Sequence, residues 1–119
     1  MISVRYIVDD LPASVDFYCN YLGFGVDMQP TEDFARVSKD NLQLYLNTPG
    51  TGAGGKAGGN PKPGGWNRIK IEVVNLDSEI ERMKNKVIFR GDIVEGRSTK
   101  QILVEDPSGN LIELSQKLN

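Results

Sequence analysis

The amino-acid sequence predicts an α+β fold made of two copies of a βαβββ module within one domain, residues 1–119. Two observations support this prediction: alternating apolar and polar residues mark strands in both halves, and the apolar stripe of one expected helix recurs 65 positions later in a second. A chain of 119 residues also has room for one compact domain. We assign residues 1–48 to the first module, 49–65 to a glycine-rich connector and 66–119 to the second module.

The first module is expected to begin with a strand over residues 1–8, in which polar and apolar side chains alternate. A helix should follow, because Asp10 suits the N-cap, Pro12 suits the first turn and Gly23 suits the end of a helix. The expected apolar stripe of this helix consists of Leu11, Val15, Tyr18 and Leu22. Short strands are then expected near residues 24–28, 34–39 and 42–47.

The second module repeats this order of elements. Residues 68–73 alternate like a strand, and Asn75 or Asp77 can cap the helix that follows. The expected apolar stripe consists of Leu76, Ile80, Met83 and Val87, each 65 positions after its counterpart in the first helix. Three more strands are expected near residues 87–94, 100–105 and 111–115. A tight turn over residues 106–110, which contains Pro and Gly, joins the last two strands.

The connector is dominated by glycine and is expected to be a mobile link or a lid over a pocket. It contains two sequences that imitate phosphate-binding motifs: residues 50–55 match G-x-G-x-x-G, and residues 50–56 match G-x-x-x-x-G-K. Prolines follow soon after, and Ala57 stands where such a loop needs a hydroxyl group. Because glycine-rich sequence produces such matches freely, we do not predict nucleotide binding.

The composition excludes several classes of function. The net charge of −2 and the isoelectric point near 5.1 argue against nucleic-acid binding, because no large basic face is available. No apolar run approaches the ~20 residues needed to span a bilayer, so no membrane partner is expected. Cys19 is the single cysteine, which rules out an intramolecular disulfide and favours a cytoplasmic protein. We expect Cys19 to be an inert thiol on a buried helix face.

The sequence contains no histidine, and this is the most informative feature for its chemistry. Histidine is the commonest metal ligand in proteins and the commonest general base near neutral pH. A metal site or an acid–base site must therefore be built here from Asp, Glu, Lys, Tyr or Gln. This excludes catalytic triads that use histidine and most zinc sites.

Three segments together carry a family resemblance: VDDLPASVDFYCNYLGF (8–24), GGWNRIKIEVVNLDSEIERMK (64–84) and EDPSGNLIEL (105–114). They resemble the vicinal oxygen chelate (VOC) superfamily, which comprises the glyoxalase/bleomycin resistance protein/dioxygenase-like domains. The resemblance implies that the two modules form an open, eight-stranded barrel-like sheet and that the chain forms a homodimer. The superfamily includes glyoxalase I, extradiol dioxygenases, methylmalonyl-CoA epimerase, fosfomycin-resistance enzymes and bleomycin-sequestering proteins, so the fold does not select a function.

In the metal-dependent members of this superfamily, the first and last strands of each module supply the inward-facing ligands. Carried over onto this chain, these positions fall on Ser3, Gln43, Arg68 and Glu113, with Tyr45 in place of Gln43 if the register differs by two. The guanidinium of Arg68 cannot donate a lone pair and would repel a divalent cation. We therefore predict no metal ligands and no cofactor, and we disfavour a divalent metal at this site.

The same strand faces are expected to line a groove for a small molecule. The expected ligand-binding residues are Ser3, Arg5, Gln43, Tyr45, Trp66, Arg68, Lys70 and Glu113. Arg68 and Glu113 could form an internal ion pair in place of the metal, or Arg68 could bind a ligand carboxylate or phosphate. Glu113 is also the candidate catalytic residue, as a general base. Trp66 could stack on a planar ligand, or it could lie in the core or in a dimer interface.

The leading hypothesis is a metal-free VOC-type protein that binds a small molecule, in the manner of proteins that sequester bleomycin-like antibiotics. The alternative is an enzyme of glyoxalase or dioxygenase type, similar to lactoylglutathione lyase, with an atypical metal site or acid–base chemistry at Glu113. A regulatory or accessory module is a third interpretation. On the first hypothesis the protein is not a metal-dependent enzyme.

Overall fold

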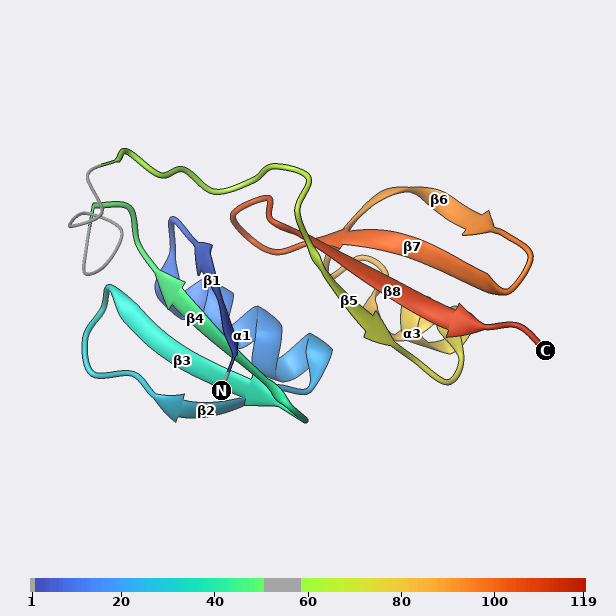
Figure 1. The fold of residues 1–119 in the computed structure, drawn as a ribbon, viewed down its shortest axis with the longest axis horizontal. Coiled ribbons are helices and arrows are strands. Elements are labelled where there is room, and N and C mark those ends of the chain that lie inside the picture. The colour runs from blue at the N-terminus through green and yellow to red at the C-terminus, as the bar shows by residue number, and fades with distance from the viewer. Residues whose placement is uncertain (1, 51–58) are drawn as a thin grey trace. The chain divides into compact units, whose positions relative to one another are not determined.

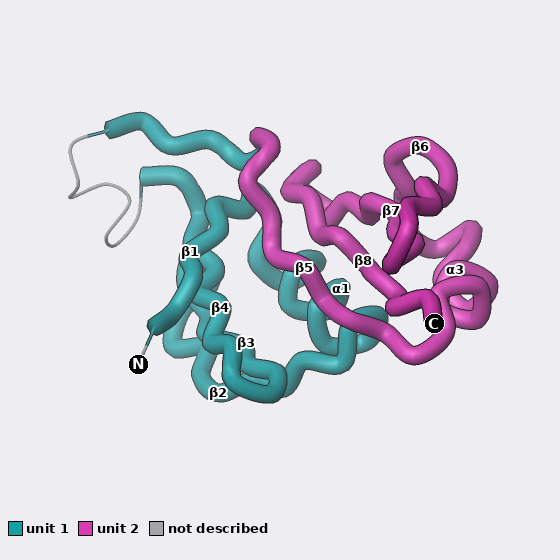
Figure 2. The backbone as a smooth tube through the Cα atoms, turned by 45° about the vertical axis from the view of Figure 1, so that its right-hand side comes forward, with its two compact units in different colours: residues 1–64 teal, residues 65–119 magenta. Residues whose placement is uncertain are grey.

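The computed structural model describes residues 2–50 and 59–119 of the chain (Figure 1). Two compact units follow one another in sequence, the first over residues 1–64 and the second over residues 65–119 (Figure 2). Each unit contains one strand, one helix and three further strands in that order among its described residues, as the alternation of side chains predicts. The fold is therefore α+β, with the predicted βαβββ order in both halves.

The first unit has the elements β1 (Ser3–Ile7), α1 (Leu11–Leu22), β2 (Gly25–Met28), β3 (Phe34–Lys39) and β4 (Leu42–Asn47). Its four strands form one sheet in the order β1-β4-β3-β2. β1 lies parallel to β4, and the other neighbours are antiparallel. The bounds of β3 and β4 are those predicted from the sequence.

The second unit has the elements β5 (Ile69–Glu72), α3 (Leu76–Met83), β6 (Ile88–Glu95), β7 (Thr99–Glu105) and β8 (Leu111–Lys117). The sheet order is β5-β8-β7-β6, with β5 parallel to β8. This is the topology of the first unit repeated. The predicted α+β fold of two βαβββ modules is thus confirmed, and the described strands form two four-stranded sheets that are not closed into a barrel.

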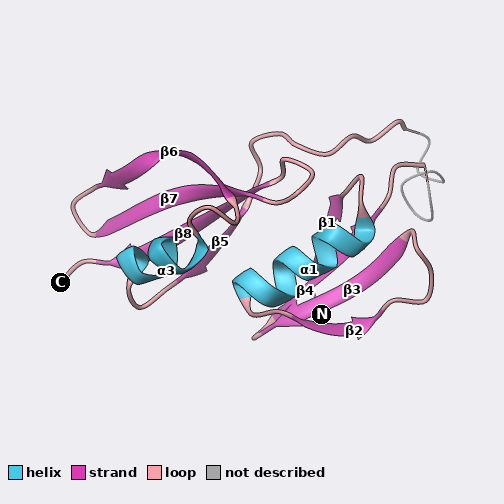
Figure 3. Cartoon of the chain, turned by 180° about the vertical axis from the view of Figure 1, so that it is seen from behind, coloured by secondary structure: helices cyan, strands magenta, loops and turns pink. Residues whose placement is uncertain are grey.

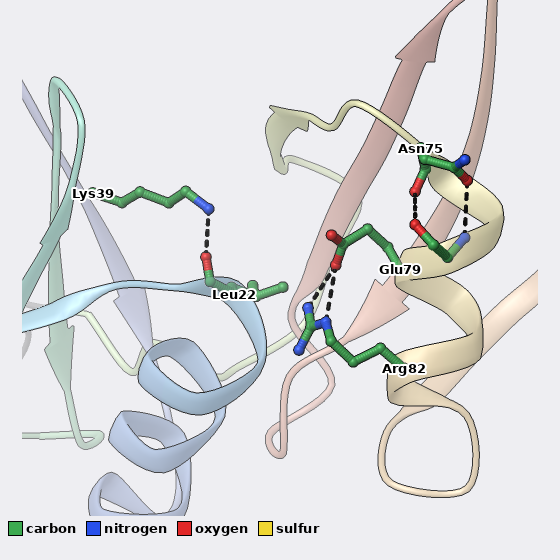
Figure 4. Close-up of polar contacts among 6 residues, drawn as sticks. Leu22, Lys39, Asn75, Glu79 and Arg82 are labelled. Atoms are coloured by element: carbon green, nitrogen blue, oxygen red, sulfur yellow. Dashed lines mark hydrogen bonds and ion pairs between the residues drawn. The ribbon is translucent and has the colours of Figure 1, made fainter.

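Both helices begin at the predicted N-caps. The backbone N–H of Ala13 donates to the carboxylate of Asp10 over 3.0 Å. The backbone N–H of Ser78 donates to the amide oxygen of Asn75 over 3.0 Å, as Figure 4 shows beside the label of Asn75. These bonds satisfy backbone donors that the first turn of a helix leaves unpaired. Asn75, and not Asp77, is therefore the cap of α3.

The two helices end by different means. Gly23 adopts a left-handed φ of 78° after α1, and the ammonium of Lys39 donates to the carbonyl of Leu22 over 2.6 Å (Figure 4). No glycine follows α3; instead Asn85 adopts a φ of 68°, a conformation that asparagine tolerates better than most residues. The helix ends at Met83, so Val87 lies outside it and the predicted stripe was one turn too long.

Each helix covers one face of the sheet in its own unit (Figure 3). The buried residues of α1 are Leu11, Ser14, Phe17, Tyr18 and Leu22. Val15 of the predicted stripe is only half-buried, because Phe17 and Tyr18 supply the larger apolar surfaces. In α3 the buried residues are Leu76 and Met83.

The sheet residues that alternate toward the helices complete the core of each unit. They are Ala35, Val37, Leu44 and Leu46 in the first unit, and Ile102, Val104, Ile112 and Leu114 in the second. The intervening residues point to the opposite sheet face, which we call the open face of each unit. No helix in the described part of the chain is long and apolar enough to cross a membrane.

Candidate functional site

The open face of the first unit brings together the predicted residues of β1 and β4. Ser3 lies opposite Gln43 in the parallel register, and its hydroxyl donates to the side-chain oxygen of Gln43 over 3.3 Å. Arg5 lies opposite Tyr45 in the same register. The alternation of side chains therefore places these predicted ligand-binding residues on one surface.

Arg5 is held by two neighbours on this face. Its Nη1 donates a hydrogen bond to the side-chain oxygen of Asn47, and its guanidinium carbon lies 5.0 Å from the centre of the Tyr45 ring. Asn47 is only 2% exposed, so the amide that receives this hydrogen bond is firmly placed. The guanidinium is thus oriented by a cation–π contact and by a buried amide.

Tyr45 connects Arg5 to the rest of the open face. Its ring centre lies 5.8 Å from that of Phe34, and its side chain is hydrogen-bonded to Arg36. That hydrogen bond is the largest influence raising the pKa of Arg36, and the carboxylate of Asp27, 3.4 Å from the guanidinium, contributes in the same direction. The sequence interpretation did not identify Arg36, although alternation between Ala35 and Val37 places it on this face.

A hollow of about 290 Å³ lies on the open face of the first unit, lined by Ser3, Val4, Arg5 and Tyr45. Pockets that hold small ligands usually have volumes of roughly 300–1,000 Å³. The hollow therefore suits a ligand, or part of a ligand, at the small end of this range. Three of its four lining residues were predicted from the sequence as ligand-binding residues.

The open face of the second unit holds the predicted ion pair between Arg68 and Glu113. Nε and Nη2 of Arg68 both donate to Oε1 of Glu113, over 3.1 and 3.0 Å. Nη1 of Arg68 donates to the backbone carbonyl of Trp66 over 3.2 Å. The Glu113 side chain is 11% exposed and the Arg68 side chain 31%, so the pair is partly shielded from water. The prediction of an internal pair is confirmed.

The second oxygen of Glu113, Oε2, accepts no hydrogen bond from a described residue. Among the described side chains, no buried oxygen or nitrogen atom is without a partner, and therefore Oε2 reaches the surface. This oxygen can accept a proton or a hydrogen bond from a bound molecule.

Trp66 and Lys70 lie beside this pair without joining it. Trp66 is 68% exposed, so the alternative of a core tryptophan is wrong. The guanidinium carbon of Arg90 lies 5.4 Å from the centre of its ring, and Arg90 also pairs with Glu105 over 3.2 Å. Lys70 is exposed, and it lies opposite Glu113 in the register but forms no ion pair within residues 59–119. Arg90 was not identified from the sequence.

The backbone shows which positions of the two units are equivalent. The N–H of Val8 donates to the carbonyl of Asn47 over 2.9 Å, and that of Val73, 65 positions later, donates to the carbonyl of Ser115 over 2.8 Å. Asn47 is therefore the counterpart of Ser115. Counting back two residues along each strand makes Tyr45, rather than Gln43, the counterpart of Glu113.

The residues at the metal positions of the resemblance do not suit a divalent ion. Within residues 2–50 and 59–119, no three His, Cys, Asp or Glu side chains gather closely enough to hold a metal. In the second unit, Glu113 is bound to a guanidinium whose fixed positive charge repels cations. In the first unit, Ser3, Gln43 and Tyr45 supply an alcohol, an amide and a phenol, which are weak ligands for transition metals.

Cys19 on α1 does not add a reactive group to either open face. Its side chain is half-buried, and burial, with a smaller contribution from Asp16, raises the pKa of the thiol. The reactive form of cysteine is the thiolate, which a raised pKa disfavours. The thiol is less buried than predicted, but its inertness is supported.

The connector motifs of residues 50–55 and 50–56 lie almost wholly outside the described residues, as do residues 51–58 of the proposed link or lid. The described parts of the connector, residues 49–50 and 59–65, contain no helix or strand.

The chain is similar to a known protein family and to several solved structures. The family model described as Glyoxalase/Bleomycin resistance protein/Dioxygenase superfamily matches residues 2–114. A member of the same superfamily from Sphaerobacter thermophilus is 25% identical, with a TM-score of 0.75, over 96% of this chain and 94% of that one. A comparison with curated proteins gives no match.

Two further solved structures share the fold. A bleomycin-binding protein from bleomycin-producing Streptomyces verticillus, complexed with copper(II)-bleomycin, is 23% identical over 95% of this chain and 92% of that one, with a TM-score of 0.62. Lactoylglutathione lyase from Agrobacterium tumefaciens is 14% identical over 98% of this chain and 92% of that one, with a TM-score of 0.76. One fold thus accommodates a binding protein and an enzyme.

Proposed function

Because this chain belongs to the Glyoxalase/Bleomycin resistance protein/Dioxygenase superfamily, we propose that it binds a small molecule on the open faces of its sheets without a resident metal ion. The proposal extends to sequestration of a bleomycin-like antibiotic, the kind of ligand bound by the similar protein from Streptomyces verticillus. Neither face carries the donor set of a metalloenzyme, and both present charged and aromatic side chains suited to holding a ligand.

The ion pair between Arg68 and Glu113 is the observation that carries the metal-free part of this proposal. A metal ion at Glu113 would lie beside the guanidinium of Arg68, whose fixed positive charge repels it, and binding through Oε1 would also displace two N–H donors. Leaving one partner of a shielded ion pair without its counter-charge is strongly unfavourable. Arg68 therefore supplies the positive charge that a metal would supply elsewhere.

Metal analysis of the full chain, purified without chelators, tests this part directly. We expect far less than one transition-metal ion per chain. Retention of one ion per chain through dialysis would contradict the proposal.

An Arg68→His variant is designed to reverse the arrangement. It removes the fixed charge and offers an imidazole nitrogen beside Glu113, so we expect it to bind Zn²⁺ or Ni²⁺ measurably by isothermal titration calorimetry. An Arg68→Gln variant is the matched control, since it removes the charge but adds no imidazole. Equal metal affinity in both variants would argue against this placement of the site.

Binding of an antibiotic is tested with bleomycin itself. Calorimetric titration of the full chain with metal-free and copper-loaded bleomycin is expected to give saturable binding, and the fluorescence of Trp66, the single tryptophan, should change on addition of the metal-free form. Absence of binding by both forms would remove the antibiotic from the proposal.

An enzyme is the second candidate function, and the exposed Oε2 of Glu113 favours it. This oxygen could take a proton from a bound substrate while Oε1 stays on Arg68. Lactoylglutathione lyase activity is the first assay to run, with Glu113→Gln as the inactive control. Turnover that Glu113→Gln abolishes, at a substoichiometric metal content, would favour the enzyme over the binding protein.

A homodimer and a cytoplasmic location stay predictions. The apolar side chains of Ile88 and Val94, exposed on β6, are candidates for a dimer interface. Light scattering at several protein concentrations would measure the mass of the assembly.

A further inference from the structure

Arg5 carries a positive charge that no carboxylate of the described residues balances by an ion pair. Within the described residues it forms no ion pair, although its guanidinium lies on the open face of the first unit. Most other arginines behave differently: each of Arg36, Arg68, Arg82 and Arg90 faces a carboxylate. Arg5 is therefore able to accept an anion from outside the chain.

The guanidinium of Arg5 is also held ready for such an anion. One of its N–H groups donates to the buried amide oxygen of Asn47, and its carbon lies 5.0 Å from the centre of the Tyr45 ring. These contacts restrain its orientation and leave other N–H groups without partners among the described residues. A donor that is oriented before binding loses less conformational entropy when a ligand arrives.

The hollow of about 290 Å³ gives the anion a place to lie, since its lining includes Arg5, Tyr45 and Ser3. Arg5 supplies positive charge and Tyr45 supplies an aromatic wall, whereas the hydroxyl of Ser3 already donates its proton to Gln43. A planar guanidinium binds planar carboxylates, and also phosphates, through paired hydrogen bonds. The lining is thus complementary to a small molecule with an oxyanion at one end and an apolar body at the other.

The second unit provides an internal comparison. Lys70 occupies the position equivalent to Arg5, 65 residues later, and it lies opposite Glu113, the counterpart of Tyr45. In the second unit the chain thus supplies its own carboxylate at this position of the last strand. In the first unit a phenol takes that place, and the anion has to come from a ligand.

We propose that the hollow beside Arg5 binds the carboxylate or phosphate group of a small molecule, with the ring of Tyr45 against its apolar part. This inference names the ligand class for the proposed binding function and rests on that function. It assigns anion recognition to Arg5 rather than to Arg68, whose guanidinium already serves Glu113.

Isothermal titration calorimetry of the full chain tests the inference with three probes: benzoate, inorganic phosphate and neutral benzamide. We expect at least one of the two anions to bind with one site per chain, and benzamide to bind far more weakly. Arg5→Gln should weaken anion binding by about 10-fold or more, because a charge-assisted hydrogen-bond pair is lost. Arg82→Gln, on the exposed surface of α3, is the matched control. It should change the affinity less than about twofold, because Arg82 does not line the hollow and water screens exposed charges.

Arg5→Lys is a second variant, which keeps the inference testable if Arg5→Gln does not fold. It keeps the charge but not the planar pair of donors, so its anion affinity should fall between those of wild type and Arg5→Gln. A tighter affinity for benzoate than for phosphate assigns the ligand to the carboxylates, and the reverse assigns it to the phosphates. Circular dichroism of both variants should match that of wild type.

Three results would overturn the inference: no binding of either anion, equal binding of benzamide, or unchanged anion affinity in both Arg5 variants. Its failure is distinguishable from failure of the proposed function. If bleomycin binding persists in Arg5→Gln and the chain holds no metal, the binding function stands and the anion site does not. If the chain retains a metal ion, the proposed function fails even where Arg5 governs benzoate affinity.

Discussion

The two units of the chain have the same backbone design but different open faces. In the first, Arg5 lies over Tyr45 and donates to an amide, with a hollow beside it. In the second, Arg68 is bound to Glu113 and an exposed Trp66 lies nearby. Among the described residues, the first face presents Arg5 without a counter-ion, whereas the arginine of the second face, Arg68, is paired with Glu113. The repeated fold therefore determines the positions of these side chains but not their interactions.

The backbone similarity extends to individual hydrogen bonds. Asp10 and Asn75 cap equivalent helices, and the carbonyls of Asn47 and Ser115 accept equivalent bonds from the ends of the first strands. The cores differ, because α1 brings aromatic residues and α3 brings Leu76 and Met83. Substitutions at fully buried sites of the two units can therefore show in which unit the loss of a core side chain lowers the free energy of unfolding more.

The largest effect is expected in the aromatic core of the first unit. Tyr18 is fully buried, and its ring makes edge contacts with Phe17 and Phe24 at centre distances of 5.1 and 5.6 Å. Tyr18→Ala should lower the free energy of unfolding by about 3–5 kcal/mol. Met83→Ala, at a fully buried site in the second unit, should fall in the lower part of the range of about 2–5 kcal/mol.

Urea denaturation followed by far-ultraviolet circular dichroism measures both values. The same experiment followed by Trp66 fluorescence reports on the second unit, where the tryptophan lies. A larger loss of stability in Met83→Ala than in Tyr18→Ala would reverse the comparison between the two cores.

An intermediate effect is expected at the ion pair of the second open face. Glu113→Gln leaves the guanidinium of Arg68 without its counter-charge, and because Arg68 is 31% exposed, water compensates part of the loss. We expect a destabilisation of about 1–2 kcal/mol, measured by urea denaturation. The control is Glu72→Gln, which breaks an exposed pair with Lys117 and should cost less than about 0.5 kcal/mol.

A double variant sharpens this prediction. Arg68→Met combined with Glu113→Leu replaces both charges by apolar groups, and it should recover most of the stability lost in Glu113→Gln. If the double variant has a lower free energy of unfolding than Glu113→Gln, the ion pair stabilises the fold by more than it costs to shield its two charges from water.

The smallest effects are expected at the helix caps. Asp10→Ala should destabilise the protein by about 0.5–1.5 kcal/mol, because it removes both the capping bond and the negative charge near the start of α1. Asn75→Ala should cost about 0.5 kcal/mol, since Asp77 and Glu79 still place negative charge in the first turn of α3. Thermal unfolding compares the two, and an equal shift in Tm would show that first-turn charge contributes little.

Much of this fold could be predicted from the sequence because its signals are local. Strict alternation predicted the bounds of β3 and β4, and the residues Asp10 and Gly23 marked the ends of α1. The end of α3 was missed because Asn85, not a glycine, takes the left-handed conformation. The separation of the strands into two sheets is a detail that the sequence does not specify, because pairing between distant strands leaves no mark in a local pattern.

The candidate site was predictable to the extent that it follows from strand register. Arg68 and Glu113 were expected to meet, and they do. Arg36 lies opposite Tyr45 in the register of β3 and β4, so alternation could have placed it on this face. Arg90 was missed because its long side chain reaches Trp66 on another segment, and no spacing rule records that reach. The exposure of Trp66 depends on the path of the connector, which glycine-rich sequence does not specify.

The parallel pairing of the first and last strands in each unit also bears on how the chain folds. β1 and β5 are edge strands, hydrogen-bonded on one side to β4 and β8, which come late in their units. Each first strand can therefore pair only after the last strand of its unit has joined the sheet. Contacts between residues far apart in the sequence slow folding. We expect the helices and hairpins to assemble early and the edge strands to dock last. In the folded protein, the same strands should be the first to exchange their amide hydrogens with solvent.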